Sequence, residues 1–196
     1  MNSLDSIGKA VDQFLKHNIP YALLHTTNLY PTPNHLVRLG AITEIAERFS
    51  GAVLGLSDHT ISNHACFGAV ALGASILERH FTDHMKREGP DIICSMDEKS
   101  AEELIAGVNI ISSQREKGKF ATREEQVTMD FAFSSVVSIK DIEEGEIFSL
   151  ENIWVKRPGS GEISASQFKK LIGKQAKSNI RIGSQIKKSQ VKNYEN

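Results

Sequence analysis

Three short apolar stretches of the chain are each followed by polar residues that include a histidine. These residues read HTTNLY from position 25, SDHT from position 57 and ERHFT from position 78. Imidazole is a general acid and base near neutral pH and a common ligand of divalent metals. A lone histidine is usually a hydrogen-bonded structural residue, whereas histidines at the ends of adjacent strands can converge on one point. The three sequences are therefore the first candidates for a functional site.

His59 and His80 form the best candidate metal pair, because each stands at a strand exit and one short helical crossover separates them. Their nitrogens suit manganese, iron, cobalt or zinc, and a metal with positions left to water or substrate is a Lewis acid for a carbonyl. We expect His25 to orient a neighbour, and Asp58 either to belong to the site or to cap the next helix. The other histidines are expected at the surface: His17, His35, His64 and His84.

Two loops carry further candidate residues. Asn28 and Tyr30 precede the sequence Pro-Thr-Pro at 31–33, whose restricted φ angles stiffen the loop after the first strand. Such a loop can hold polar groups at a ligand, or it can be a simple proline-rich turn. Asp91 lies in a loop of about 16 residues after the third strand, which is a candidate lid or binding loop. Its carboxylate could bind a hydroxyl group.

The elements that must position these residues alternate along the first part of the chain. Apolar residues at helical spacing predict helices over 4–15, 36–49, 63–72 and 99–114. Apolar runs predict strands over 21–26, 52–56 and 74–77. Strands that alternate with amphipathic helices indicate a parallel sheet, in which ligands bind beyond the carboxyl ends of the strands. That edge is where the histidine sequences stand.

A different pattern begins after a polar segment, 117–133, which we interpret as a linker. The spacing of apolar and glycine residues from Asp141 to Ile153 recurs 38 positions later, from Asn179 to Val191. Gly145 and Gly183 would supply the turns, and a helix is expected over 166–172. The repeat predicts a compact β-rich module of about 60 residues, a size that is marginal for folding alone. The residues expected to face its core are Phe148, Ile153, Ile186 and Val191.

Arg157 is the candidate functional residue of this second part. It precedes the turn Pro-Gly-Ser-Gly at 158–161, where its guanidinium could reach a carboxylate, a phosphate or an amide carbonyl, or make an exposed salt bridge. Basic residues between 169 and 192 could likewise attract an anion or form a solvated face.

The composition is that of a globular protein of one or two domains, with 196 residues, 40% hydrophobic and 24% charged. No apolar run reaches the roughly 18 residues that span a bilayer, and residues 1–16 contain no apolar signal-peptide segment. We therefore expect a cytoplasmic protein without a membrane partner. No nucleic-acid-binding motif occurs, and the two cysteines are too few for a disulfide framework.

In this order, the sequences LLHTTNLYPTP, GLSDHT, ERHFTD, GPD and VKRPGSGEIS resemble the sialic acid synthase (N-acetylneuraminate synthase) family. Residues 1–116 resemble the last part of that family's TIM-type (β/α)₈ barrel, and residues 134–196 resemble its antifreeze-like SAF domain. The resemblance implies an α/β fold, in which the last three strands of a barrel are followed by a small β-rich SAF domain of the β-clip type.

The resemblance also implies a reaction. The family condenses phosphoenolpyruvate with N-acetylmannosamine or a related amino sugar to give a nonulosonic acid and phosphate. It uses a divalent metal, usually Mn²⁺, with Mg²⁺ or Co²⁺ as alternatives. Matched position by position, His59 and His80 would be the metal ligands, and Asn28 and Ser57 would contact phosphoenolpyruvate.

The sugar-directed residues follow from the same match. Tyr30 and Asp91 would face the sugar, and Arg157 would enter the active site of the partner subunit in a domain-swapped homodimer. The predicted catalytic set is therefore His59, His80, Tyr30, Asp91 and Arg157. The chain departs from the family at Thr26, Arg79 and Ile92, where Cys, Lys and His are common.

A complete (β/α)₈ barrel takes about 250 residues, whereas the barrel-like part here is shorter and has three predicted strands. We therefore expect the C-terminal part of a synthase that lacks the first five strands and is not active alone. Two alternatives stay open. A separate chain could supply the N-terminal half of a split synthase, or the protein could be a non-catalytic remnant or a module that binds a sugar or another protein.

Overall fold

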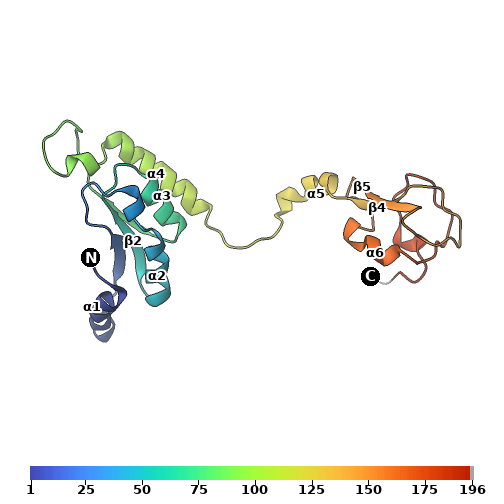
Figure 1. The fold of residues 1–196 in the computed structure, drawn as a ribbon, viewed down its shortest axis with the longest axis horizontal. Helices are drawn as coiled ribbons and strands as arrows, with labels where there is room; N and C mark the ends of the chain where they lie inside the picture. The colour runs from blue at the N-terminus through green and yellow to red at the C-terminus, as the bar shows by residue number, and fades with distance from the viewer. Residues whose placement is uncertain (195–196) are drawn as a thin grey trace. The chain divides into compact units, whose positions relative to one another are not determined.

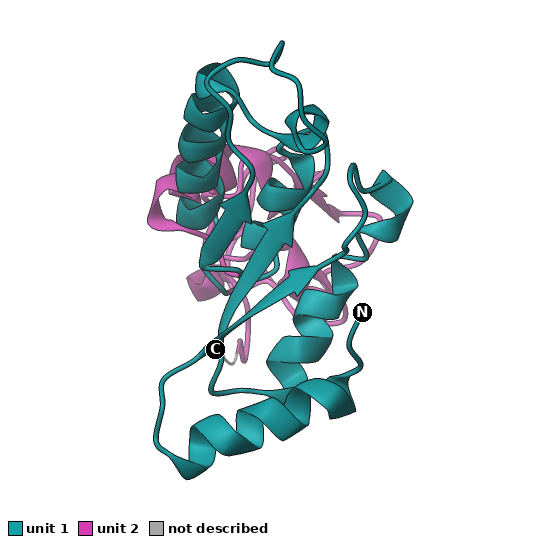
Figure 2. Ribbon diagram, turned by 90° about the vertical axis from the view of Figure 1, so that its left-hand side faces the viewer, with its two compact units in different colours: residues 1–117 teal, residues 118–196 magenta. Residues whose placement is uncertain are grey.

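The computed structural model describes residues 1–194. The chain divides into two compact units, Met1–Lys117 and Gly118–Asn196 (Figure 2). Each unit is described by itself below. Among the described residues, no helix combines the length and the apolar character that crossing a membrane requires.

Unit 1 contains the predicted parallel sheet. Its strands are β1 (Ala22–Thr26), β2 (Val53–Asp58) and β3 (Ile76–Arg79), in the order β1-β2-β3. Both pairs are parallel, and the last register pair of β2 and β3 joins Asp58 to Arg79. The strands β2 and β3 thus end two residues later than the apolar runs predict, because backbone pairing continues through Ser57-Asp58 and Glu78-Arg79.

Helices cover one face of this sheet (Figure 1). Leu56 of β2 packs in a core with residues of α2 (Gly40–Arg48), α3 (His64–Ala71) and α4 (Glu98–Ser113). Within unit 1 the opposite face is open, since Val53 and Ile76 are exposed. Successive side chains of a strand point to opposite faces, so this one-sided burial tells which residues of β2 face the helices.

In unit 1 the helix predictions hold with one correction. α1 (Leu4–Lys16), α3 and α4 lie within about a residue of the expected ranges. The segment expected as one helix over 36–49 is a short 3-10 turn, Asn34–Leu36, followed by α2. The helix cannot run through because Arg38 has a left-handed backbone conformation, with φ of 52°.

Unit 2 begins with helical residues inside the segment 117–133, which the sequence predicts as a linker. A 3-10 turn, Arg123–Glu125, leads into α5 (Gln126–Ala132), and β4 (Ser135–Ser138) pairs with β5 (Ile153–Lys156) in antiparallel fashion. The helix expected over 166–172 is confined to α6 (Phe168–Leu171), after a 3-10 turn.

The internal repeat is confirmed by reciprocal backbone hydrogen bonds. Ile142 and Ile180 each donate to the other's carbonyl, both at 2.8 Å. Gly145 donates to Ala176, and its counterpart Gly183 donates to Ser138. Both glycines have the predicted positive φ, 87° and 80°. The four predicted core residues of the module are fully or almost fully buried: Phe148, Ile153, Ile186 and Val191.

Candidate active site

The structure brings His59 and His80 together. His59 follows the last residue of β2 and His80 follows the last residue of β3, so the parallel register puts both at the same edge of the sheet. Their ring centroids are 5.2 Å apart, with the rings edge to face at 76°. His59 is almost completely buried, and the side chain of His80 is one-quarter exposed.

Oxygen atoms lie near the Nδ1 atoms of both rings. His59 Nδ1 lies 3.1 Å from the backbone oxygen of Thr27. A carbonyl oxygen only accepts, so Nδ1 is the donor, and in the neutral imidazole this leaves the lone pair on Nε2. His80 Nδ1 lies 3.7 Å from Asp91 Oδ2, which comes from the long loop after β3. Carboxylates and carbonyls at Nδ1 are the usual partners of imidazoles that bind metal through the other nitrogen.

Tyr30 completes an aromatic cluster with the two histidines. Its ring centroid lies 4.2 Å from that of His59 and 5.7 Å from that of His80. The loop that carries Tyr30 is tied to the strand end, because the backbone N–H of Thr32 donates to the carbonyl of His59 at 2.8 Å. The hydroxyl of Thr32 also lies 2.8 Å from the carbonyl of Leu29. The ring contact of Tyr30 and the backbone hydrogen bond of Thr32 thus both hold the loop against His59.

Ser57 and Glu78 lie two residues before the histidines as a cross-strand pair. The Ser57 hydroxyl donates to Glu78 Oε2 at 2.5 Å. The alternation of the strand puts both side chains on the face of the sheet opposite to Asp58 and Arg79. Glu78 was not among the predicted site residues, because the apolar run that predicts this strand ends at position 77 whereas β3 continues to Arg79.

Asn28 and His25 occupy other surroundings. Asn28 lines a small pocket of about 160 Å³ together with Leu24 and Thr26. His25 is buried, and its Nε2 lies 2.7 Å from the carbonyl of Val37, so it orients the segment before α2. The other four histidines are exposed, as predicted.

Of the two roles expected for Asp58, the cap of the next helix is not formed. Its carboxylate is buried beside Arg79, with Asp58 Oδ2 3.3 Å from Arg79 Nε. The residue at the start of α3 is Asn63, so Asp58 does not cap that helix. Burial, together with the negative charge of Asp58, raises the pKa of the neighbouring Cys66 thiol to about 12.

Arg157 belongs to unit 2, directly after β5. Its guanidinium carbon lies 5.9 Å from the ring centroid of Phe131, and it forms no ion pair within the part of the chain that the structure describes. The turn after it is held by the Ser135 hydroxyl, which donates to the carbonyl of Pro158 and accepts from the N–H of Gly161. The salt bridge considered for Arg157 is thus not formed.

The donor set suits a divalent transition metal that keeps open positions. Two imidazoles, each with an oxygen near Nδ1, could provide nitrogen ligands through Nε2. No group of three or more histidine, cysteine, aspartate or glutamate side chains that could hold a metal is found among residues 1–194. The described residues would therefore supply two ligands and leave the others to water or substrate.

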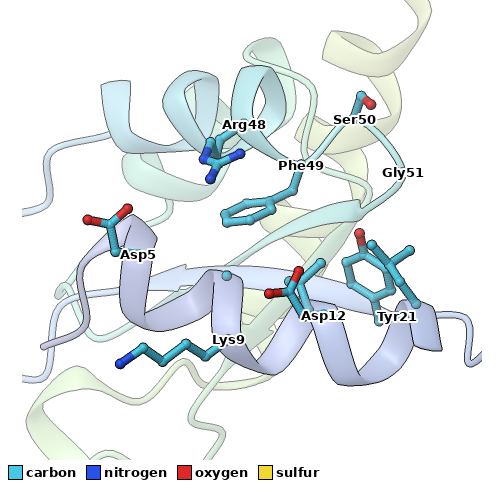
Figure 3. A pocket seen from close by; sticks show the side chains of 11 residues that line it. Asp5, Lys9, Asp12, Tyr21, Arg48, Phe49, Ser50 and Gly51 are labelled. Atoms are coloured by element: carbon cyan, nitrogen blue, oxygen red, sulfur yellow. The ribbon is translucent and has the colours of Figure 1, made fainter. Parts of the chain in front are cut away.

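A separate pocket of about 490 Å³ lies at the other end of the strands, where β1 and β2 begin (Figure 3). It is formed between α1 and the end of α2, and Tyr21 and Gly51 line it just before β1 and β2. Ligands of parallel sheets bind at the carboxyl ends of the strands, which is the edge with the histidines. The pocket is therefore distinct from the candidate active site.

Two protein families match successive parts of the chain. Residues 1–120 match the NeuB family, and residues 133–192 match the SAF domain. The chain is 36% identical over 185 residues to the N,N'-diacetyllegionaminic acid synthase of Campylobacter jejuni, which covers 92% of this chain and 55% of that protein. It is 34% identical over 166 residues to a pseudaminic acid synthase of C. jejuni, covering 85% of this chain and 48% of that protein. The chain spans about half the length of these curated relatives.

Solved structures show the same likeness. The spore coat polysaccharide biosynthesis protein E of Chromobacterium violaceum superposes with a TM-score of 0.73 over 97% of this chain and 58% of its own, at 19% identity, which concerns the fold alone. The N-acetylneuraminic acid synthetase of Leptospira borgpetersenii, solved with citrate, gives a TM-score of 0.61 and 29% identity over 66% of this chain and 45% of its own.

Proposed function

Because the chain belongs to the NeuB family and carries a SAF domain, we propose that it forms the metal-binding and sugar-facing part of a nonulosonic acid synthase. The reaction would join phosphoenolpyruvate to N-acetylmannosamine or a related N-acetylated amino sugar, with release of phosphate. The observation that carries the proposal is the convergence of His59 and His80 at one sheet edge, 5.2 Å apart.

His59 and His80 are the residues that would hold a divalent metal, Mn²⁺ first, through their Nε2 atoms. When bound there, such an ion would act as a Lewis acid toward the aldehyde of the open-chain sugar. The protein's own contribution is orientation: the Thr27 carbonyl holds Nδ1 of His59, and the Asp91 carboxylate, 3.7 Å from His80 Nδ1, lies where it could orient the second ring.

The substrates would meet residues around this pair. Tyr30 lies against both imidazoles and is half exposed, so its ring and hydroxyl can face a sugar that approaches from solvent. The Asp91 carboxylate can accept a hydrogen bond from a hydroxyl group of that sugar. The Ser57 hydroxyl, which donates to Glu78 in this structure, could instead donate a hydrogen bond to the phosphoenolpyruvate carboxylate. The Glu78 carboxylate would then be free to accept a proton. Asn28 is the second proposed contact to phosphoenolpyruvate.

Two larger features belong to the proposal. The three parallel strands would be part of a TIM-type barrel, because helices cover one face of the sheet while Val53 and Ile76 line an open face where a barrel has its interior. Arg157 would act in the site of a second subunit of a domain-swapped homodimer. Its guanidinium has no carboxylate partner within the described residues, which leaves its donors for a ligand.

The test is phosphate release from phosphoenolpyruvate with N-acetylmannosamine and Mn²⁺. Because unit 1 supplies three strands, the assay is run with the chain alone and with the added N-terminal segment of the C. jejuni relative that precedes the matched region. We expect release in the supplemented assay and its loss, by at least about 100-fold, in His59→Ala and in His80→Ala.

A matched control is His64→Ala, since His64 is exposed on α3 and lies outside the site. It should keep full activity. Release that is unchanged in both His59→Ala and His80→Ala would contradict the metal assignment. A folded chain that releases no phosphate in either assay, with N-acetylmannosamine or with di-N-acetylated amino sugars, would contradict the proposed reaction and favour the non-catalytic alternative.

A further inference from the structure

A buried ion pair lies directly behind the two histidines. Arg79 and Asp58 are the last paired residues of β3 and β2, and Arg79 Nε lies 3.3 Å from Asp58 Oδ2. Their side chains are 1% and 2% exposed. Each residue immediately precedes one of the histidines, so the pair joins the two strands at the point where the chain continues into the candidate site.

The same ion pair holds both neighbours of His59 in the chain. Asp58 precedes His59, and its carboxylate accepts the backbone N–H of Thr60 at 3.0 Å and the Thr60 hydroxyl at 2.9 Å. Arg79 Nη2 donates to the carbonyl of Thr60 at 2.8 Å. Thr60 is almost completely buried. The backbone of His59 is therefore held on both sides by contacts that depend on one carboxylate and one guanidinium.

Arg79 is in turn connected to the helical layer. Its Nη1 donates to Asn63 Oδ1 at 2.5 Å, and Asn63 Nδ2 donates to the Ser100 carbonyl and to Glu103 Oε2 of α4. On the other side of Arg79, the carbonyl of His80 accepts the N–H of Met96 at 2.9 Å. The guanidinium thus links the end of β3, the segment after β2 and α4.

We propose that the Arg79–Asp58 pair positions His59 and His80 relative to one another, so that both Nε2 atoms can reach one metal ion. Arg79 and Asp58 would be positioning residues, since their side chains lie on the face of the sheet opposite to Ser57 and Glu78 and contact each other, Thr60 and Asn63. This inference rests on the proposed function for the identity of the two ligands. A lysine at position 79 would keep the charge but not the planar fork of donors that reaches Asn63 and Thr60 together.

The chemistry of a buried ion pair supports a positioning role over a stabilising one. Desolvation of two charges offsets much of their attraction, so an uncharged pair of similar volume is often tolerated by the fold. Removal of one partner leaves a buried charge and is strongly destabilising. The informative variant therefore removes both charges at once, as in Asp58→Asn with Arg79→Met.

The experiment measures Co²⁺ affinity by calorimetry on the full chain, because Co²⁺ binds imidazole more tightly than Mn²⁺ does. Thermal unfolding monitors the fold in parallel. We expect the Asp58→Asn/Arg79→Met chain to bind Co²⁺ about 10- to 100-fold more weakly, the range typical for loss of groups that orient metal ligands. Arg79→Lys, which places the residue common in the family at this position, should weaken binding by a smaller factor, less than about 10-fold.

The chain offers a matched control in the exposed ion pair of Asp83 and Arg87 on the loop after β3. Asp83→Asn with Arg87→Met removes the same two charges and should leave the dissociation constant unchanged. An unchanged dissociation constant in the folded Asp58→Asn/Arg79→Met chain would overturn the inference, whether or not its unfolding temperature falls. If that variant does not fold, Arg79→Lys decides: wild-type affinity in Arg79→Lys would overturn the inference equally.

The same titrations separate the two proposals. If the unaltered chain binds Co²⁺ no better than a His59→Ala/His80→Ala chain, the metal site of the proposed function is wrong. If the unaltered chain binds more tightly than that chain, and the variants of the buried ion pair bind as tightly as the unaltered chain, only the positioning role is wrong.

Discussion

Cys66 illustrates how far the cluster behind the histidines is removed from water. Its thiol is fully buried, and its Sγ lies 3.7 Å from Asp58 Oδ2. Burial and the charge of Asp58 raise its pKa from 9.0 to about 12. Only the thiolate is an effective nucleophile, so this cysteine is expected to be chemically inert in the folded chain.

We predict that a disulfide reagent at about pH 8 modifies no cysteine of the folded chain at the rate of a free thiol, because Cys94 is fully buried as well. Both cysteines should react after unfolding in denaturant. The measurement is thiol titration with and without denaturant. Modification of Cys66 in the native chain at the rate of a free thiol would contradict the burial of this cluster.

The raised pKa also predicts a pH dependence of stability. The folded state favours the protonated thiol, so its contribution is fully present below pH 9.0 and is lost as the pH rises toward about 12. Unfolding temperatures measured from pH 8 to pH 10.5 should therefore fall less steeply for Cys66→Ala than for the unaltered chain. Equal slopes would contradict the prediction.

At the scale of single residues, the sequence led to the two histidines and Tyr30 but not to the roles of their neighbours. The convergence of His59 and His80 follows from the polarity of a parallel sheet, which alternating elements reveal. The roles of Asp58 and Glu78 depend on where β2 and β3 end, because one residue of difference moves a side chain to the other face. Apolar runs do not mark that end when the last strand residues are polar.

At the scale of elements, periodicity identified most of the helices and all three strands of the parallel sheet. It overlooked the interruption before α2, where Arg38 takes a left-handed conformation that no apolar pattern encodes. It also missed α5, which has only seven residues, most of them exposed, too few for a helical period to stand out. The repeat in unit 2 was detectable because two glycines and an apolar spacing recur together.

The two equivalent glycines give a prediction at this scale. Gly145→Ala and Gly183→Ala should each destabilise unit 2 by about 1–2 kcal/mol, because a side chain at positive φ clashes with the following carbonyl. Open space surrounds both positions, so no packing clash contributes. The two losses should be similar, since the glycines occupy equivalent turns of the repeat.

The measurement is chemical denaturation of the full chain, with Gly40→Ala as control. Gly40 also has open space around it and begins α2 with a negative φ, so alanine there should be neutral or slightly stabilising. Losses below about 0.3 kcal/mol in both unit 2 variants would show that the positive φ values do not strain alanine.

At the scale of the whole chain, each unit has its own hydrophobic core. The core of unit 2 consists of ten buried residues, from Val136 to Val191, and none of them belongs to unit 1. The sequence alone suggested that this module is marginal for its size. Its reciprocal hydrogen bonds and continuous core supply a physical reason for independent stability, which composition and length do not reveal.

The last prediction concerns the segment that joins the units. Residues 115–122 form no helix or strand and are exposed, and they contain Lys117 and Lys119. Proteases need extended, accessible backbone, so limited trypsin treatment should cleave first in this segment, at these lysines and at Arg115, and yield two resistant fragments. Lys169 and Lys170 are exposed too, but they lie in α6 beside the core residue Leu171 and should be cut more slowly.

Mass spectrometry of the early products checks the order of cleavage, and the isolated fragment that begins at residue 118 or 120 should unfold cooperatively on heating. Early cleavage at Lys169 or Lys170 would mean that unit 2 opens as readily as the joining segment. A non-cooperative transition of the fragment would mean that its ten-residue core is not sufficient alone. Cooperative unfolding would instead show that the SAF domain carries Arg157 on an independently folded support, as the proposed delivery of this side chain to a second subunit's site would require.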